Sequence, residues 1–268
     1  MATWKELLHP GDAKDFFARC PMPPFNPNTH SYSRANARWL AELSRLSYRH
    51  DVEETDTPPR PTQSRILEIA GCTRRQFFFS RKTDTQAMLL EFSTTVPFAV
   101  LVFRGTEQNT KDFVTDLKLG RLRHDDGKID THSGFTQALD SVWDDIERAL
   151  KRLQLPVFFT GHSLGAALAT LAAARITPTA LYTFGSPRVG DNEFVASLEP
   201  LARRIHRVVH GEDVVTTVPP EAFGFCHLGE LHILESPKSS AWLDWLLAWL
   251  RPPKPLSDHA PVNYVDKT

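Results

Sequence analysis

A serine between two glycines, in the pentapeptide GHSLG (161–165), separates an apolar run, VFFT (157–160), from an alanine-rich run (164–176). G-x-S-x-G between a strand and a helix is typical of a nucleophile elbow, a strained turn that exposes a serine above the carboxyl end of a buried strand. Glycines are needed there because a Cβ would strike the neighbouring strand and helix. We therefore predict that Ser163 is a catalytic nucleophile; the alternative is a serine that caps an ordinary helix.

The remaining sequence alternates between strand-like and helix-like segments. Helices are expected at 33–50, 133–153, 164–176 and 192–198, and strands at 65–70, 76–80, 86–92, 98–103, 157–160, 179–184 and 205–209. From residue 105 onward the order is β-α-β-α-β, which predicts a mainly parallel sheet with helices on both faces, an α/β class. At 268 residues the chain fits a single domain, 1–268. Active sites in such sheets lie at the carboxyl ends of the strands.

A serine hydroxyl needs a base to take its proton and an acid to orient that base. In α/β-hydrolases these residues follow the serine in the order acid, then histidine. Asp213 lies just after the apolar strand 205–209, where the orienting acid is expected. Glu212, its neighbour, and Asp191, which follows an earlier strand, are the competing acids.

Three histidines follow Asp213 and are candidates for the base: His227, His232 and His259. His227 and His232 lie in a run, CHLGELHIL, that is typical of a strand, whereas His259 lies in a polar, proline-flanked loop that could fold over the site. We expect His259 to be the base, with His227 as the main alternative. His162 is adjacent to the serine, but the elbow turn points neighbouring side chains apart, so His162 is not expected to be the base.

Acyl transfer also needs two hydrogen-bond donors directed at the oxyanion. The backbone N–H of Leu164, the residue after the serine, is expected to supply the first. The segment Phe103-Arg104-Gly105-Thr106 follows the apolar strand 98–103 and offers Thr106 as the second, unless this segment is only a turn.

Composition excludes other classes of function. The chain has 31 Lys and Arg against 32 Asp and Glu, a net charge of −1, and lacks the basic footprint of a nucleic-acid-binding protein. Its cysteines, Cys20, Cys72 and Cys226, show neither a zinc pattern nor an even disulfide count, so no metal site is expected. The N-terminal residues lack an apolar signal-peptide core, which predicts a cytoplasmic location unless a precursor has been trimmed.

Several blocks appear in the order found in one family. They are FRGT (103–106), HSGF (132–135), GHSLGAALA (161–169), TFGSPRVGD (183–191), Asp213 followed by VPP (218–220), and His259 five residues before Tyr264. With these blocks the chain resembles the class 3 lipases, α/β-hydrolases related to the fungal triacylglycerol lipases. In that pattern Asp191 resembles a structural position and Asp213 the catalytic acid.

The resemblance implies hydrolysis of the carboxylic esters of lipids, as by a triacylglycerol lipase or carboxylesterase, through an acyl-enzyme and without a cofactor or metal. It makes Thr106 an oxyanion residue and implies a lid, here at 107–130. Alternatives are a phospholipase of the A type, an esterase for small or aryl esters, or a non-catalytic lipid-binding module. Fungal members of the family are secreted and disulfide-bonded. This sequence shows neither a signal peptide nor a disulfide pattern, so their secreted role is not carried over.

One apolar segment, AWLDWLLAWL (241–250), has no place in the family pattern and is expected to form a helical insertion at 237–256. Its Trp and Leu residues occupy one broad arc of a helix, which is typical of a core helix. Tryptophan also favours lipid interfaces, and the segment lies between the acid and base loops. A lipid contact through Trp242, Trp245 and Trp249 is therefore the second interpretation.

Overall fold

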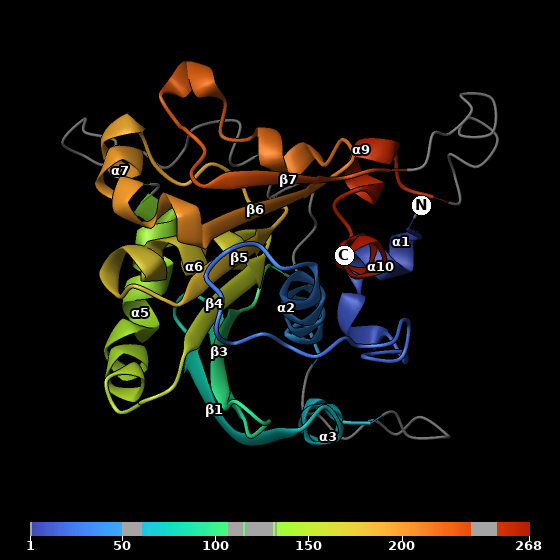
Figure 1. Cartoon of the computed structure of the whole chain (residues 1–268). Helices are drawn as coiled ribbons and strands as arrows, with labels where there is room; N and C mark the ends of the chain where they lie inside the picture. Colours follow the sequence, from blue (N-terminus) through green and yellow to red (C-terminus); the bar gives the residue numbers. More distant parts are fainter. Residues whose placement is uncertain (1, 50–60, 107–114, 116–130, 132, 237–250) are drawn as a thin grey trace.

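The computed structural model describes residues 2–49, 61–106, 115, 131, 133–236 and 251–268. Its centre is a seven-stranded sheet whose strands lie side by side in the order of the sequence (Figure 1). The first three strands pair antiparallel and all later neighbours pair parallel, so the predicted mainly parallel sheet is confirmed. The strands are β1 (Cys72–Ser80), β2 (Thr85–Phe92), β3 (Phe98–Phe103), β4 (Val157–His162), β5 (Ala180–Phe184), β6 (Ile205–His210) and β7 (Glu230–Leu234).

Helices cover both faces of the sheet (Figure 1). One face packs against α5 and α6, and the other against α2 and α10. The described helices are α1 (Trp4–Leu8), α2 (Arg34–Leu46), α3 (Gln63–Ile69), α5 (Ser133–Leu150), α6 (Leu164–Arg175), α7 (Asn192–Ser197), α9 (Lys254–Ser257) and α10 (Pro261–Lys267). None of the helices in these described ranges is long and apolar enough to cross a membrane.

Strand β3, FAVLVF, explains why both faces need a helical layer. Every one of its residues is buried, and alternate side chains point to opposite faces. Leu101 and Phe103 join the cluster under α5 and α6, whereas Val100 and Val102 join the cluster under α2. An apolar strand without polar alternation is the pattern of a central strand covered on both sides.

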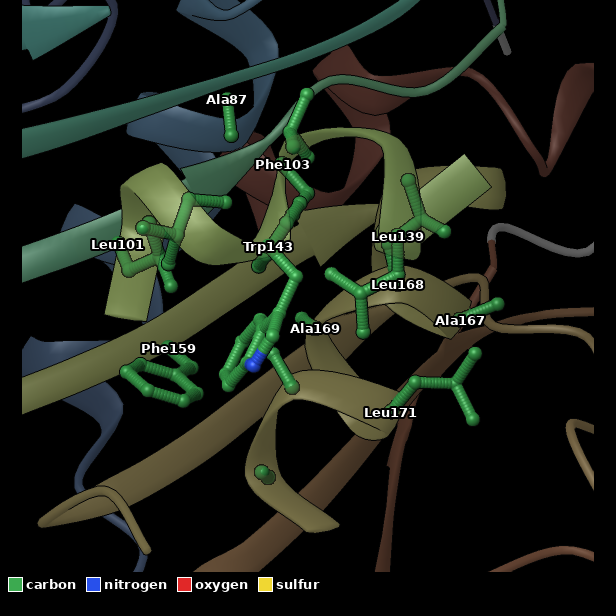
Figure 2. Packing of buried hydrophobic residues seen from close by; sticks show 14 of the residues in the cluster. Ala87, Leu101, Phe103, Leu139, Trp143, Phe159, Ala167, Leu168, Ala169 and Leu171 are labelled. Carbon is green, nitrogen blue, oxygen red and sulfur yellow. The ribbon is translucent and has the colours of Figure 1, made fainter. Parts of the chain in front are cut away.

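Helix α6 carries the residues that follow the serine and is buried on nearly all sides. Figure 2 shows Leu168 and Ala169 of α6 among Leu139 and Trp143 of α5 and Phe103 of β3. A helix that is apolar all round requires such enclosure. Its small alanine side chains allow α6 to lie close to the sheet, which fixes the start of the helix relative to β4.

Most expected elements are confirmed, but the strand expected at 65–70 is wrong. This segment lies in α3, where the Thr62 side chain accepts a hydrogen bond from the Arg65 backbone N–H and caps the helix. Gln63, Ile66 and Leu67 are buried at helical spacing, whereas Ile69 is 71% exposed. The apolar residues therefore follow a period near 3.6, which a short window does not distinguish from a strand.

Two predicted segments lie mostly outside the described residues. The lid expected at 107–130 lies outside the described residues except for Thr115. The insertion expected at 237–256 lies outside them up to residue 250, with Trp242, Trp245 and Trp249, and its last residues lead into α9.

Candidate active site

Ser163 occupies the turn between β4 and α6. Its backbone angles are φ 59° and ψ −126°, a positive φ that is strained for a residue with a side chain. The Ser163 N–H donates to the carbonyl of Phe184 at 3.0 Å, which ties the turn to the end of β5. A strained serine at the end of a buried parallel strand has the geometry of a nucleophile elbow.

The two glycines of GHSLG allow three backbone segments to meet. A Cβ on Gly161 would lie 2.3 Å from the backbone of Gly165, and a Cβ on Gly165 would lie 2.2 Å from the carbonyl oxygen of Phe103. Both distances are shorter than any carbon contact tolerates. Glycine at both positions therefore brings β3, β4 and α6 together behind Ser163.

Asp213 and His259 come together at the same edge of the sheet. Asp213 follows β6, and its carboxylate oxygens lie 2.8 and 2.9 Å from His259 Nδ1. A carboxylate only accepts, so Nδ1 carries the proton and His259 Nε2 keeps a lone pair. Ser163, Asp213 and His259 are all buried, with exposed fractions of 2%, 1% and 2%. The His259 ring also lies against His162, next to the serine, with centroids 4.4 Å apart.

The carboxylate of Asp213 stays ionised despite its burial. Burial alone would raise its pKa, but His259 and the hydroxyl of Tyr264, which donates to Asp213 Oδ2, hold the pKa below the ordinary value of 3.8. The N–H of Val215 donates to the other oxygen at 2.9 Å. Burial and the nearby Asp213 raise the pKa of Tyr264 well above 10, which keeps its O–H as a donor.

Replacing Tyr264 by phenylalanine is expected to lower the free energy of unfolding by about 1.5 to 3 kcal/mol at pH 7, because a buried carboxylate loses a donor. A lowered carboxyl pKa stabilises the fold above the unfolded value, and this stabilisation is lost as the pH falls through the folded value. The difference between the Tyr264→Phe variant and the wild type should therefore shrink below pH 3.8. Urea unfolding of both proteins at several pH values between 7 and 3 measures this difference in the free energy of unfolding.

Tyr182→Phe is the matched control for this experiment. The buried hydroxyl of Tyr182 accepts from the Ser33 N–H and donates to the Ser31 carbonyl, both uncharged groups. Its loss should cost a similar amount at every pH in this range. An equal dependence on pH in the two variants would contradict the role given to Tyr264.

Gly185 leaves room for this pair of side chains. It has a φ of +58°, and a Cβ there would lie 2.6 Å from Asp213 Oδ2 and 3.0 Å from His259 Nδ1. The sequence interpretation placed Gly185 and Tyr264 in family blocks but gave neither a role. Neither residue type carries a catalytic signal by itself, and the positive φ and the hydroxyl contact appear only in the fold.

His162 supports the site through its neighbours. Its Nε2 lies 2.7 Å from the carbonyl oxygen of His259, which only accepts, so Nε2 carries the proton and Nδ1 accepts from the Tyr48 hydroxyl at 2.9 Å. Burial, followed by the charge of His259, lowers the pKa of His162 to about 3. A neutral imidazole with both nitrogens engaged holds the backbone of His259 beside the elbow.

The competing candidates have other partners. The backbone N–H of Phe194 at the start of α7 donates to the Asp191 side chain, and the exposed Glu212 accepts from Lys254. His227 Nε2 lies 2.7 Å from the carbonyl of Thr216, while His232 lies beside Glu230 on β7. Of these alternatives none is joined to Ser163 or to the Asp213 side chain by a hydrogen bond among the described residues.

The proposed oxyanion donors flank the elbow. Leu164 is the first residue of α6, where backbone N–H groups have no partner within the helix. Thr106 lies three residues after β3, whose Phe103 pairs with Gly161 of β4. A Cβ on Gly105 would lie 2.7 Å from the carbonyl oxygen of His162, so this loop lies directly against the elbow.

Residues 100–223 match the family model described as Lipase (class 3), a range that includes Ser163 and Asp213. A secreted mono- and diacylglycerol lipase of Fusarium solani is 36% identical over 129 residues, covering 44% of this chain and 39% of that protein. A chloroplastic phospholipase A1 of Arabidopsis thaliana is 41% identical over 97 residues, covering 32% of this chain and 22% of that protein. The chain spans less than two thirds of the length of the curated relatives it matches.

Among solved structures, lipase II of Rhizopus niveus is similar, with a TM-score of 0.52 and 30% identity, covering 61% of this chain and 67% of that chain. Together with the helix-flanked parallel sheet, this likeness confirms the expected α/β-hydrolase fold.

The expected cytoplasmic location is wrong, because the relatives of this chain include a secreted lipase and a chloroplastic phospholipase. Three free cysteines do not decide the compartment. A fold of this size is held by its apolar core with or without disulfides.

Proposed function

Because the chain belongs to the class 3 lipase family, we propose that it hydrolyses the carboxylic ester bonds of lipids through an acyl-enzyme intermediate. Ser163 is the nucleophile, His259 the general base and acid, and Asp213 the orienting acid. The observation that carries this proposal is the buried Asp213–His259 pair, with N–O distances of 2.8 and 2.9 Å, at the edge of the sheet where the strained Ser163 turns into α6. We assign these residues to one domain spanning the chain.

The direction of proton transfer follows from the hydrogen bond between Asp213 and His259. With Nδ1–H donated to Asp213, the lone pair on His259 Nε2 takes the Ser163 Oγ proton as Oγ attacks the acyl carbon. The carboxylate stabilises the imidazolium that forms, and the same proton passes from Nε2 to the leaving alcohol. A water molecule then gives a proton to Nε2 and attacks the acyl carbon. As the bond between the acyl carbon and Ser163 Oγ breaks, Nε2 returns that proton to Oγ, which releases the fatty acid and restores both residues.

The charge on the acyl oxygen needs donors that are already in position. We assign these to the backbone N–H of Leu164 and to Thr106, whose loop follows β3. The N-terminal end of α6 adds a favourable partial positive charge. In this scheme the chemistry uses side chains and backbone groups alone.

Replacing Thr106 by valine is expected to lower kcat for a p-nitrophenyl ester by up to about 10² to 10³-fold, with little change in KM, because an oxyanion donor acts in the transition state. Steady-state kinetics measures both constants. Thr131→Val, at a hydroxyl that is hydrogen-bonded to Thr136 among the described residues, is the control. An increase in KM with an unchanged kcat would assign Thr106 to ground-state binding instead.

Acylglycerols are the first substrates to test, since the relative from Fusarium solani is described as a mono- and diacylglycerol lipase. The relative from Arabidopsis thaliana favours phospholipids as the second candidate, because it is described as a phospholipase A1. We further propose that Trp242, Trp245 and Trp249 contact the lipid surface, because the sequence 241–250 repeats Trp and Leu at a spacing typical of an apolar helix face and tryptophan favours interfaces.

Fatty-acid release from emulsified acylglycerols, from phosphatidylcholine vesicles and from soluble p-nitrophenyl esters tests these proposals together. Acylglycerol hydrolysis supports the first substrate class, and faster release from the vesicles would replace it with the phospholipid class. Hydrolysis confined to soluble esters would contradict a lipid substrate. Equal activity on emulsions after Trp→Ala replacement at all three positions would refute the interfacial contact.

A further inference from the structure

Three side chains that could bind a metal meet where β6 and β7 begin. The parallel register pairs His206 with Glu230, so the two side chains lie on the same face of the sheet. His232 is two residues after Glu230 on β7 and shares that face, because side chains alternate along a strand. One nitrogen from each histidine and one oxygen of Glu230 all lie within 4.8 Å of one another.

One ring nitrogen of each histidine faces this cluster. His206 Nε2 lies 2.8 Å from the carbonyl oxygen of His30, which only accepts, so Nε2 carries the proton and Nδ1 faces the cluster unprotonated. A metal-binding histidine is usually held in this way by a carbonyl behind it. His206 Nδ1 and His232 Nε2 are buried atoms without a hydrogen-bond partner among the described residues.

The burial of the cluster is a second reason to expect a cation there. His206 is completely buried, and a buried polar atom without a partner is costly. A cation would satisfy both nitrogens at once.

The distances from Glu230 to the two histidines fit zinc. Glu230 Oε2 lies 3.5 Å from His206 Nδ1 and 3.4 Å from His232 Nε2. Zinc binds nitrogen and oxygen at about 2.0 to 2.2 Å in tetrahedral geometry, which places ligand atoms roughly 3.3 to 3.5 Å apart. Two imidazoles and one carboxylate are a donor set that suits this ion.

The cluster lies close to the protein surface, and a neighbouring aromatic ring holds the imidazole of His232 in place. Glu230 has a 60% exposed side chain, and with Tyr32 and Gly229 it lines a surface hollow beside the cluster. The Tyr32 ring stacks on His232 with centroids 3.7 Å apart, which fixes the plane of the imidazole.

We propose that His206, Glu230 and His232 form a Zn²⁺ site with water as the fourth ligand. The ion would join the start of β6 and β7 to each other and, through His206, to the segment around His30. His206 is at the amino end of β6, whereas Asp213 follows its carboxyl end. The zinc would therefore lie at the opposite end of this strand from the proposed catalytic residues. Its role is to stabilise the fold and not to take part in ester hydrolysis.

Titration of the EDTA-treated and dialysed full chain with ZnCl₂ in a calorimeter tests the site. We expect one ion per chain, a rise in the melting temperature on binding, and at least about tenfold weaker binding in Glu230→Gln and in His232→Gln, since each loses one of three ligands. Glu235→Gln and His9→Gln, at exposed positions, are the matched controls and should bind as the wild type does.

Circular dichroism without zinc checks that both variants fold, so that weaker binding is not mistaken for unfolding. If either variant fails to fold, Co²⁺ binding to the wild type replaces it, and the absorption spectrum of a tetrahedral site with nitrogen and oxygen ligands is expected. Binding with unchanged affinity in folded Glu230→Gln and His232→Gln would overturn the proposal. So would an octahedral Co²⁺ spectrum or the absence of saturable binding.

Discussion

Replacement of Ser163 by alanine is expected to lower kcat for ester hydrolysis by about 10⁴ to 10⁶-fold, because the acyl-enzyme can no longer form. The residual rate would come from the oxyanion donors and substrate binding. The fold should be kept, since the Cβ of alanine takes the place of the Cβ of serine and the backbone hydrogen bond from Ser163 N–H to Phe184 remains. Hydrolysis of a p-nitrophenyl ester, alongside thermal unfolding, measures both effects.

Ser186→Ala is the matched control for Ser163→Ala. Ser186 is also buried near the site, but its hydroxyl bonds the carbonyl of Pro187 and takes no part in the proposed chemistry. This control should retain activity within about tenfold. Wild-type activity in Ser163→Ala would refute the assignment of the nucleophile.

Replacement of Gly185 by alanine is expected to lower kcat by about 10² to 10⁴-fold. The new Cβ would lie 2.6 Å from Asp213 Oδ2 and 3.0 Å from His259 Nδ1, so the carboxylate and imidazole must move apart. A shift of about 1 Å in a catalytic group can cost 10²-fold, and complete loss of the orienting acid costs about 10⁴-fold. Kinetics at several pH values and a comparison with Asp213→Asn measure the effect.

Gly224→Ala separates this clash from backbone strain. Gly224 also has a positive φ, +86°, but a Cβ there would meet no atom within 4 Å. Both variants should lose stability, by roughly 1 to 2 kcal/mol from the strained backbone, yet only Gly185→Ala should lose most of its activity. Equal activities in the two variants would contradict the role of Gly185 as a positioning residue.

Much of the fold was predictable because its signals are local. The apolar strand 98–103 and the GHSLG elbow depend on contiguous residues, and the structure has them where the sequence predicts them. The choice of Asp213 and His259 depended on chain order and loop placement, and the structure brings these two together. Their catalytic roles stay a prediction until they are tested by mutation.

The features that sequence reasoning missed depend on contacts between distant segments. Tyr264 reaches Asp213 from α10, and Gly185 is required only because two side chains pass over it. The His206–Glu230 pair arises from the register of two parallel strands and leaves no spacing motif in the sequence. In α3, the buried residues recur at helical spacing, which contradicts the expected strand. This spacing becomes visible only once the structure shows which residues are buried.

The central claim is that Ser163 is a nucleophile activated by the Asp213–His259 pair. Labelling of the intact chain with a fluorophosphonate, followed by mass spectrometry of the peptides, tests it most directly, because the reagent forms a stable adduct only with an activated serine. We expect a single adduct on Ser163 that forms at least about 10²-fold more slowly in Asp213→Asn. Labelling at another serine, or at an equal rate in Asp213→Asn, would contradict the claim.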